Sequence, residues 1–281
     1  MSDRGQASSR TRALIADLRR RLGAADPMPA KVAVPPIAAP PAHVFPTPAR
    51  RGRFAAQAAQ HTTALLGIGH VGTRYATDVV LQFKAELAVA HAAVAAELPA
   101  GWFEQQGYLA LQSRVRDHRE FLLRPDLGRR LDEPSLAALR ARGGTCDVQI
   151  ILADGLSAVA CQGAGVALCG LLADACRARG WTVGAPVGAR FARVWLEDEI
   201  GEIAGAKVAV IVLGERPGLG TGDGLSAYLV YEPRIGRVDG ERNMMSNIHA
   251  RGTTPEQAAR RLAALIGAML AQRRSGVALD L

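Results

Sequence analysis

Short apolar runs alternate with longer helical stretches in the C-terminal half of the chain, and this alternation restricts the fold more than any other feature. The pattern predicts strands at 146–152, 182–187 and 208–213. Helices are expected between them, at 158–179 and 194–203. Because a β-α-β-α-β order places successive strands in parallel, the sequence indicates an α/β fold with a Rossmann-like, doubly wound sheet.

Two short strands and a last helix complete this predicted domain, which we place at 144–281. The strands are expected at 227–231 and about 243–245. The helix begins at Pro255 after a capping box of Thr254 and Gln257. Its apolar residues fall on one face at helical spacing: Leu262, Leu265, Ile266, Met269 and Leu270.

The segment 61–143 is mostly helical in pattern and is predicted to form a helical subdomain before the sheet. Residues 79–98 are rich in alanine and contain few polar side chains. A second helix is expected to begin after Asp132 and to end at Gly143, because an acidic N-cap, a proline in the first turn and a terminal glycine mark its bounds.

Residues 1–60 are predicted to form a flexible N-terminal extension. Apolar side chains at 12–22 share one helical face with arginines around it, which indicates a short amphipathic helix. The proline-rich stretch 27–48 is expected to be an extended linker. A helix on a linker is typical of a targeting or docking peptide; the alternative is a frayed terminus without a role.

Charge is concentrated in this extension, which carries +7 of the net charge of +8. A basic scaffold or nucleic-acid-binding protein is therefore the alternative function. The near-neutral remainder and the lack of interleaved aromatic residues argue against nucleic acid. No run of 18 apolar residues predicts a membrane span. The four cysteines have no C-x-x-C spacing, which predicts buried thiols and no metal site.

A glycine-rich loop follows the third predicted strand, at 214–224. It holds five glycines, one proline and the charged residues Glu215, Arg216 and Asp223. Glycine lets the backbone approach a bulky ligand closely, and the loop falls at the carboxyl edge of the sheet, where such domains bind ligands. No Ser-His-Asp arrangement or phosphate-binding P-loop accompanies it. We therefore expect a binding site without its own catalytic residues.

Six ordered blocks resemble the small (light) subunit of ethanolamine ammonia-lyase, a bacterial lyase that depends on adenosylcobalamin. The resemblance covers 67–281. The blocks are Gly-Ile-Gly-His-Val-Gly-Thr-Arg at 67–74, Leu-Leu-Arg-Pro-Asp-Leu-Gly-Arg-Arg-Leu at 122–131, Asp-Val-Gln-Ile-Ile-Leu-Ala-Asp-Gly-Leu-Ser at 147–157, Gly-Glu-Arg-Pro-Gly-Leu-Gly at 214–220, Ser-Asn-Ile-His at 246–249 and Arg-Ser-Gly-Val at 274–277.

The resemblance implies a subunit that binds adenosylcobalamin against a large catalytic subunit, which is the expected hetero-oligomeric partner. The complex would convert ethanolamine to acetaldehyde and ammonia by a radical mechanism, and this chain alone would be inactive. The cofactor contacts carry over to Val194, Glu215 and Met244. Met244 stands where the family usually has cysteine. The resemblance also implies a location in the cytoplasm, either free or inside a bacterial microcompartment.

Three other motifs have simpler interpretations. The glycines of 67–72 match a dinucleotide fingerprint but lack a β-α-β unit around them, so a free-standing Rossmann enzyme is disfavoured. His249 lies in a stretch one letter away from a signature for histidine ligation of cobalamin, but an asparagine replaces its acidic residue; we expect a packing role. Asp198, Glu199 and Glu202 are expected on a helix surface, in salt bridges.

Overall fold

A computed structural model describes residues 70–219, 222–250 and 252–280. All of these belong to one compact unit, Pro46–Leu281. The amphipathic segment 12–22 and the proline-rich stretch 27–48 lie outside the described residues, so the expectations for them stay predictions, as does the division at 60 and 143.

A six-stranded sheet forms the centre of the described structure, in the order β3-β5-β4-β6-β7-β8. The first four strands run parallel, whereas β7 and β8 are antiparallel to their neighbours. This mixed, mostly parallel sheet with flanking helices confirms the α/β class. The strands are β3 (Leu109–Gln112), β4 (Cys146–Ala153), β5 (Val187–Arg190), β6 (Ala206–Gly214), β7 (Leu225–Tyr231) and β8 (Arg242–Ile248).

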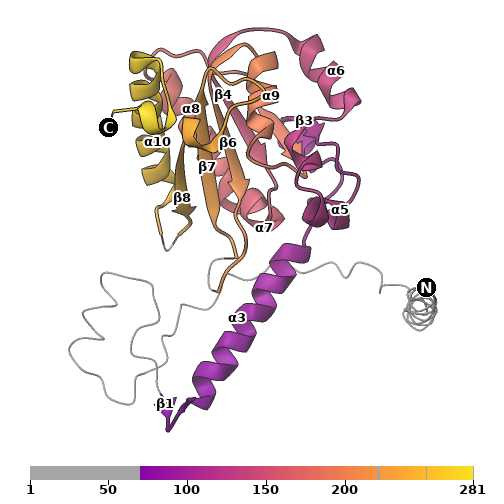
Figure 1. Cartoon of the computed structure of the whole chain (residues 1–281), viewed down its shortest axis with the longest axis vertical. Coiled ribbons are helices and arrows are strands. Elements are labelled where there is room, and N and C mark those ends of the chain that lie inside the picture. The colour runs from indigo at the N-terminus through magenta and orange to yellow at the C-terminus, as the bar shows by residue number, and fades with distance from the viewer. Residues whose placement is uncertain (1–69, 220–221, 251, 281) are drawn as a thin grey trace, which may run out of the picture. The chain divides into compact units, whose positions relative to one another are not determined.

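Helices cover both faces of the sheet (Figure 1). On one face, α8 (Val166–Arg177) and α10 (Pro255–Gln272) pack on the larger core cluster. On the other face, α6 (Glu133–Arg142) and α9 (Leu196–Ile203) cover the smaller one. The strands β4 and β6 are apolar on both faces because they are buried on both sides.

The helix predicted at 158–179 is present but changes its winding. It begins as α7 (Ala158–Ala160), passes through a π-helical turn at Cys161–Gly165 and continues as α8. Ala158–Arg177 is also the one candidate span that length and apolar composition identify among the described residues. Because α8 packs against the sheet and beside α10, with its apolar residues in the larger core cluster, it is a helix of the protein core.

The second predicted strand, 182–187, is misplaced: β5 begins where that prediction ends. Gly184 passes so close to Gln149 that a Cβ there would lie 2.1 Å from the amide oxygen. Pro186 has no N–H to donate, and its carbonyl accepts a hydrogen bond from Leu109 at 3.0 Å. The regular ladder therefore starts at Val187, beside β3 and β4.

The segment expected to be helical also contributes β3, which pairs with β5 at the sheet edge. Its first described residues form a hairpin of β1 (His70–Val71) and β2 (Arg74–Tyr75) with Gly72 at φ +62° in the turn, so the fingerprint glycine closes a hairpin. The other elements here are α3 (Thr77–Ala95), α4 (Trp102–Gln105), α5 (His118–Leu123) and the 3-10 turn Leu127–Arg129.

The predicted helix caps are confirmed. The Asp132 carboxylate accepts the N–H of Ser135 at the start of α6. Thr254 and Gln257 form the expected capping box of α10, whose apolar face packs into the larger core cluster. All four cysteines are buried free thiols, as predicted. Two further 3-10 turns, Asp239–Glu241 and Gly276–Ala278, pack together beside the start of β8.

Candidate functional site

The loops that follow β4 and β6 meet beside the point where the strand order reverses. The chain passes from β4 through α8 to β5 on one side, and then from β5 through α9 to β6 on the other. In doubly wound sheets, the loops after the two strands at the switch point, here β4 and β5, diverge and leave a crevice at the carboxyl edge. The fold thus places the glycine-rich loop where such domains bind ligands.

Backbone contacts fix the start of the glycine-rich loop against the loop after β4. The N–H of Leu156 donates to the Gly214 carbonyl at 2.9 Å. Gly155 has φ +55°, and a Cβ on it would lie only 2.3 Å from the same carbonyl oxygen. Further along, the Ser157 hydroxyl donates to the Gly222 carbonyl at 2.8 Å. The two loops therefore form a single support.

A buried carboxylate, Asp154, holds the third loop of this edge. It accepts the N–H groups of Phe191 at 2.9 Å and of Ala192 at 3.3 Å. Burial raises the pKa of Asp154 to about 6, although these donors favour the charged form. Phe191 adopts φ 51°, a left-handed conformation that is strained for this residue. Asp154 thus sets the course of the backbone that leads to Val194.

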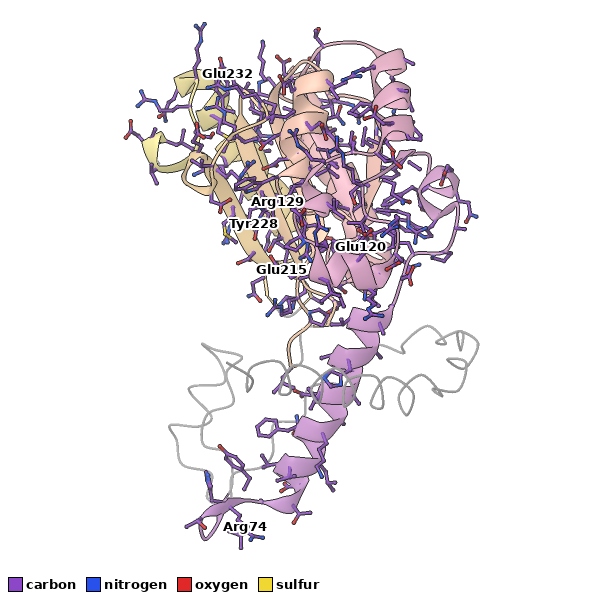
Figure 2. The ribbon with its side chains drawn as sticks, turned by 45° about the vertical axis from the view of Figure 1, so that its right-hand side comes forward. Arg74, Glu120, Arg129, Glu215, Tyr228 and Glu232 are labelled. Carbon is purple, nitrogen blue, oxygen red and sulfur yellow. The ribbon has the colours of Figure 1, made fainter. Side chains whose placement is uncertain are left out.

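Glu215 lies at the start of the glycine-rich loop, beside the side chain of Tyr228 on β7. The Glu215 N–H donates to the Gly224 carbonyl at 2.9 Å, which closes the neck of the loop. The Tyr228 hydroxyl donates to the Glu215 carboxylate at 3.4 Å. Burial and the adjacent carboxylate raise the pKa of Tyr228 to about 12, so its hydroxyl keeps its proton. Figure 2 labels this pair, with Glu232 at the opposite end of the sheet.

Met244 is an exposed apolar side chain in the middle of β8. It pairs with Tyr228 in the ladder, so both side chains stand on the same face of the sheet. This is the face that α9 covers over the parallel strands. Met244 lies beyond the part of this face that α9 covers, and the residue is 52% exposed. An uncovered thioether beside a tyrosine and a carboxylate is suited to a large, partly apolar ligand.

Val194 and Trp195 lie in the turn before α9, on the same face. Val194 is half-buried and packs on the cluster that also receives Tyr228. The Trp195 indole N–H donates to Asp239 at 2.6 Å. The Arg129 guanidinium lies over the Trp195 ring, 4.4 Å from its centroid. These contacts hold the turn before α9 against two 3-10 turns, Leu127–Arg129 and Asp239–Glu241.

The acidic residues in the first turn of α9 are buried, which corrects the expectation of a surface position for Asp198 and Glu199, whereas Glu202 is exposed as expected. Arg242 on β8 donates to Glu197 at 2.6 Å and to Asp198 at 2.6 Å, and all three side chains are nearly inaccessible. Glu199 accepts the N–H of Leu131 at 2.7 Å. The predicted salt bridges are thus present but internal, and they join α9 to the strand that carries Met244.

The structure therefore brings the three residues assigned from the resemblance to one face of the sheet. Tyr228 connects two of them, because it bonds to Glu215 and pairs with Met244. Val194 packs on the adjoining cluster. Sequence reasoning missed Tyr228, Trp195 and Arg129. Arg129 lies in the block 122–131 that carries part of the resemblance, and Tyr228 lies on the strand after the glycine-rich loop, but neither position indicated the contact that the side chain makes in the fold.

His249 has the packing role that its sequence context favoured. It is 4% exposed, and its Nε2 lies 2.6 Å from the Asn247 Oδ1 atom in the turn after β8. Among the residues that the structure describes, no group of three or more His, Cys, Asp or Glu side chains is arranged to hold a metal ion.

The chain is thus an α/β protein with two joined loops at the carboxyl edge of its sheet, beside an uncovered face with Tyr228 and Met244. The carboxyl edge is where α/β domains in general bind their ligands. A model of the ethanolamine ammonia-lyase light chain family matches residues 54–280. The chain therefore belongs to this family and is a subunit of a lyase. A light chain implies a heavy chain as its partner.

Proposed function

We propose that this chain binds adenosylcobalamin on the face formed by Val194, Glu215 and Met244, where it meets the heavy subunit. The assembled enzyme converts ethanolamine to acetaldehyde and ammonia. In this proposal the light chain contributes binding and orientation, and the heavy chain holds the substrate and the groups that act on it.

The uncovered face at Met244, next to the switch-point loops, is the observation that carries the proposal. A corrin is a broad, flat macrocycle with amide side chains around its edge. The exposed thioether of Met244 can pack against such a surface. The Glu215 carboxylate, already held by Tyr228, can accept hydrogen bonds from edge amides. The residues present thus fit the cofactor.

Bound adenosylcobalamin supplies radical chemistry through homolysis of its cobalt–carbon bond. The residues of this chain orient the cofactor and exclude water from it. Asp154 holds the backbone that leads to Val194, and Arg242 ties α9 to β8. A rigid wall of this kind limits the positions that a bound corrin can adopt.

Met244 makes this site differ chemically from one with cysteine. A thioether donates no proton and is a weak acceptor, so a contact that depends on a thiol is absent here. Its longer side chain buries more apolar surface on a ligand. We therefore expect packing, rather than hydrogen bonding, at this position.

Co-expression with a heavy chain tests the proposal. The complex should produce acetaldehyde from ethanolamine only when adenosylcobalamin is added, and either chain alone should be inactive. Activity of the light chain alone, or none from a folded complex with cofactor, would contradict it. Met244→Lys should weaken cofactor binding to the complex by about tenfold, the equivalent of ~1.4 kcal/mol.

Ile235→Lys is the matched control for this variant. Ile235 is also an apolar residue with about half of its surface exposed, at 49%, but it lies beyond β7 at the opposite end of the sheet. It should leave cofactor binding unchanged. Equal weakening by both substitutions would show that added charge, and not the position of Met244, is responsible.

Residues 1–60 serve location rather than catalysis in this proposal. Their basic, proline-rich composition is typical of a tethered targeting segment. We propose that the enzyme works in the cytoplasm, either free or inside a microcompartment that this segment addresses. Fusion of residues 1–60 to a fluorescent protein in a microcompartment-forming host separates the two locations.

A further inference from the structure

Three arginines gather beside the proposed binding face, and none of them forms an ion pair with a carboxylate among the described residues. Arg193 directly precedes Val194, and Arg216 directly follows Glu215. Arg129 stacks on Trp195, and the N–H of Arg193 donates to the carbonyl of neighbouring Gly128 at 2.8 Å. Each arginine thus belongs to an element that shapes the face.

The Arg193 side chain is held in place, but one of its hydrogen-bond donors has no partner among the described residues. One of its terminal nitrogens donates to the Phe121 carbonyl at 2.7 Å, and its guanidinium lies 4.1 Å from the centroid of the Phe121 ring. Its Nε atom is buried and has no hydrogen-bond partner among the described residues. Burial and the neighbouring Arg129 and Arg216 lower the pKa of Arg193, although the Asp154 carboxylate acts in the opposite direction. Positive charges are therefore crowded together here.

The nearby carboxylates are engaged elsewhere. Asp154 accepts two backbone N–H groups, and Glu215 accepts the hydroxyl of Tyr228. Within the described part of the chain, neither Arg129 nor Arg216 has a hydrogen-bonded or ion-paired acidic partner. Crowded like charges of this kind are unfavourable unless an anion binds among them. The cluster is suited to a phosphate group, which arginine binds with short, charge-assisted hydrogen bonds.

We propose that Arg129, Arg193 and Arg216 form a phosphate subsite for the nucleotide tail of the cofactor. This inference rests on the proposed function. The tail of a cobalamin carries a phosphodiester, whereas the side chains around its corrin are neutral amides. The phosphodiester is therefore the part of the ligand whose charge complements this cluster. The subsite would fix the direction in which the tail leaves the corrin, and so the rotation of the corrin on the Met244 face.

Two probes that differ only in a phosphate test the subsite. Adenosylcobinamide lacks the nucleotide tail, and adenosylcobinamide phosphate carries a phosphate on the shortened tail. The complex of full-length light and heavy chains should bind the second probe about tenfold or more tightly than the first, since hydrogen bonds to charged groups stabilise by roughly 1.5–3 kcal/mol. Binding is measured by equilibrium dialysis, without turnover.

The exposed arginines give a variant that should still fold. The double substitution Arg129→Gln and Arg216→Gln should reduce the preference for the phosphate probe to about threefold or less. A matched control removes Arg177 and Arg234 in the same way; both are exposed arginines with acidic partners elsewhere on the surface. This control should keep the full preference.

Four results would overturn the inference. The cluster variant could keep the full phosphate preference. The variant could instead bind both probes equally weakly. It could also fail to assemble with the heavy chain. Either result would indicate that the arginines pair with carboxylates of that chain. A wild-type complex that binds no adenosylcobalamin at all would contradict the proposed function itself, and the subsite with it.

Discussion

Gly155 offers the sharpest test of how the switch-point loops are held together. We expect Gly155→Ala to destabilise the protein strongly, although it adds one methyl group. The residue has φ +55°, a conformation that costs about 1–2 kcal/mol for a residue with a Cβ. The added Cβ would also lie 2.3 Å from the oxygen and 2.9 Å from the nitrogen of Gly214. Both are backbone atoms, so no rotamer change relieves the overlap.

The loops must therefore separate, and the hydrogen bond from Leu156 to Gly214 is lost at a further cost of about 1 kcal/mol. The total is about 3 kcal/mol, which corresponds to a fall of roughly 6–12 °C in the melting temperature for a domain of this size. Because Gly214 precedes Glu215, cofactor affinity of the assembled enzyme should fall as well. Thermal unfolding of the full-length chain and cofactor binding to the complex measure the two effects.

Gly170→Ala is the matched control, since it makes the same chemical change within α8. No heavy atom lies within 4 Å of the added Cβ, and alanine favours a helix interior by about 0.5–1 kcal/mol over glycine. This variant should be slightly more stable and bind the cofactor normally. Our account of the switch point fails if Gly155→Ala melts within 1–2 °C (roughly 0.5 kcal/mol) of the wild type and binds the cofactor equally well.

Arg242→Met should destabilise by about 3–5 kcal/mol, because it leaves Glu197 and Asp198 as buried carboxylates without a cation; neutralising both acids in the same variant should restore most of the stability in urea unfolding, and no recovery would refute this reason. Burial raises the pKa of Asp154 from 3.8 to about 6, so its contribution to stability is present below pH 4 and is lost as the pH rises through 6. Asp154→Asn should remove that part of the pH dependence, and an unchanged slope of unfolding free energy between pH 4 and 6.5 would contradict the assignment. Deletion of residues 1–50 should leave the activity of the complex within about twofold, the equivalent of ~0.4 kcal/mol in the barrier, and a larger loss would place part of the site in that segment.

The sequence predicted the elements whose signals are local. Both caps of α6, the capping box of α10 and the apolar strands β4 and β6 were found, because each depends on residues within a few positions of one another. The placement of β5 was wrong for the opposite reason. Where its ladder begins depends on Gln149 and Leu109, which are distant in sequence from Pro186.

The acidic run of α9 shows the same limit. Asp198 and Glu199 were expected on a solvated helix surface, since charged side chains are seldom buried without partners. The partners come from elsewhere: Arg242 on β8 and the backbone of Leu131. The sequence near 197–199 gives no indication of these partners. Only the folded structure revealed that this acidic run is buried.

The sequence by itself determined the α/β class, the glycine-rich loop and the family, because periodicity, glycine content and ordered motifs are properties of short segments. The tertiary structure alone decided which side chains share the site. Tyr228 meets Glu215 and Met244 because the registers of β6, β7 and β8 place them on one face. Likewise, Arg129 stacks on the ring of Trp195, a residue distant from it in the sequence. Contacts between distant residues follow from strand order and register, which no single segment encodes.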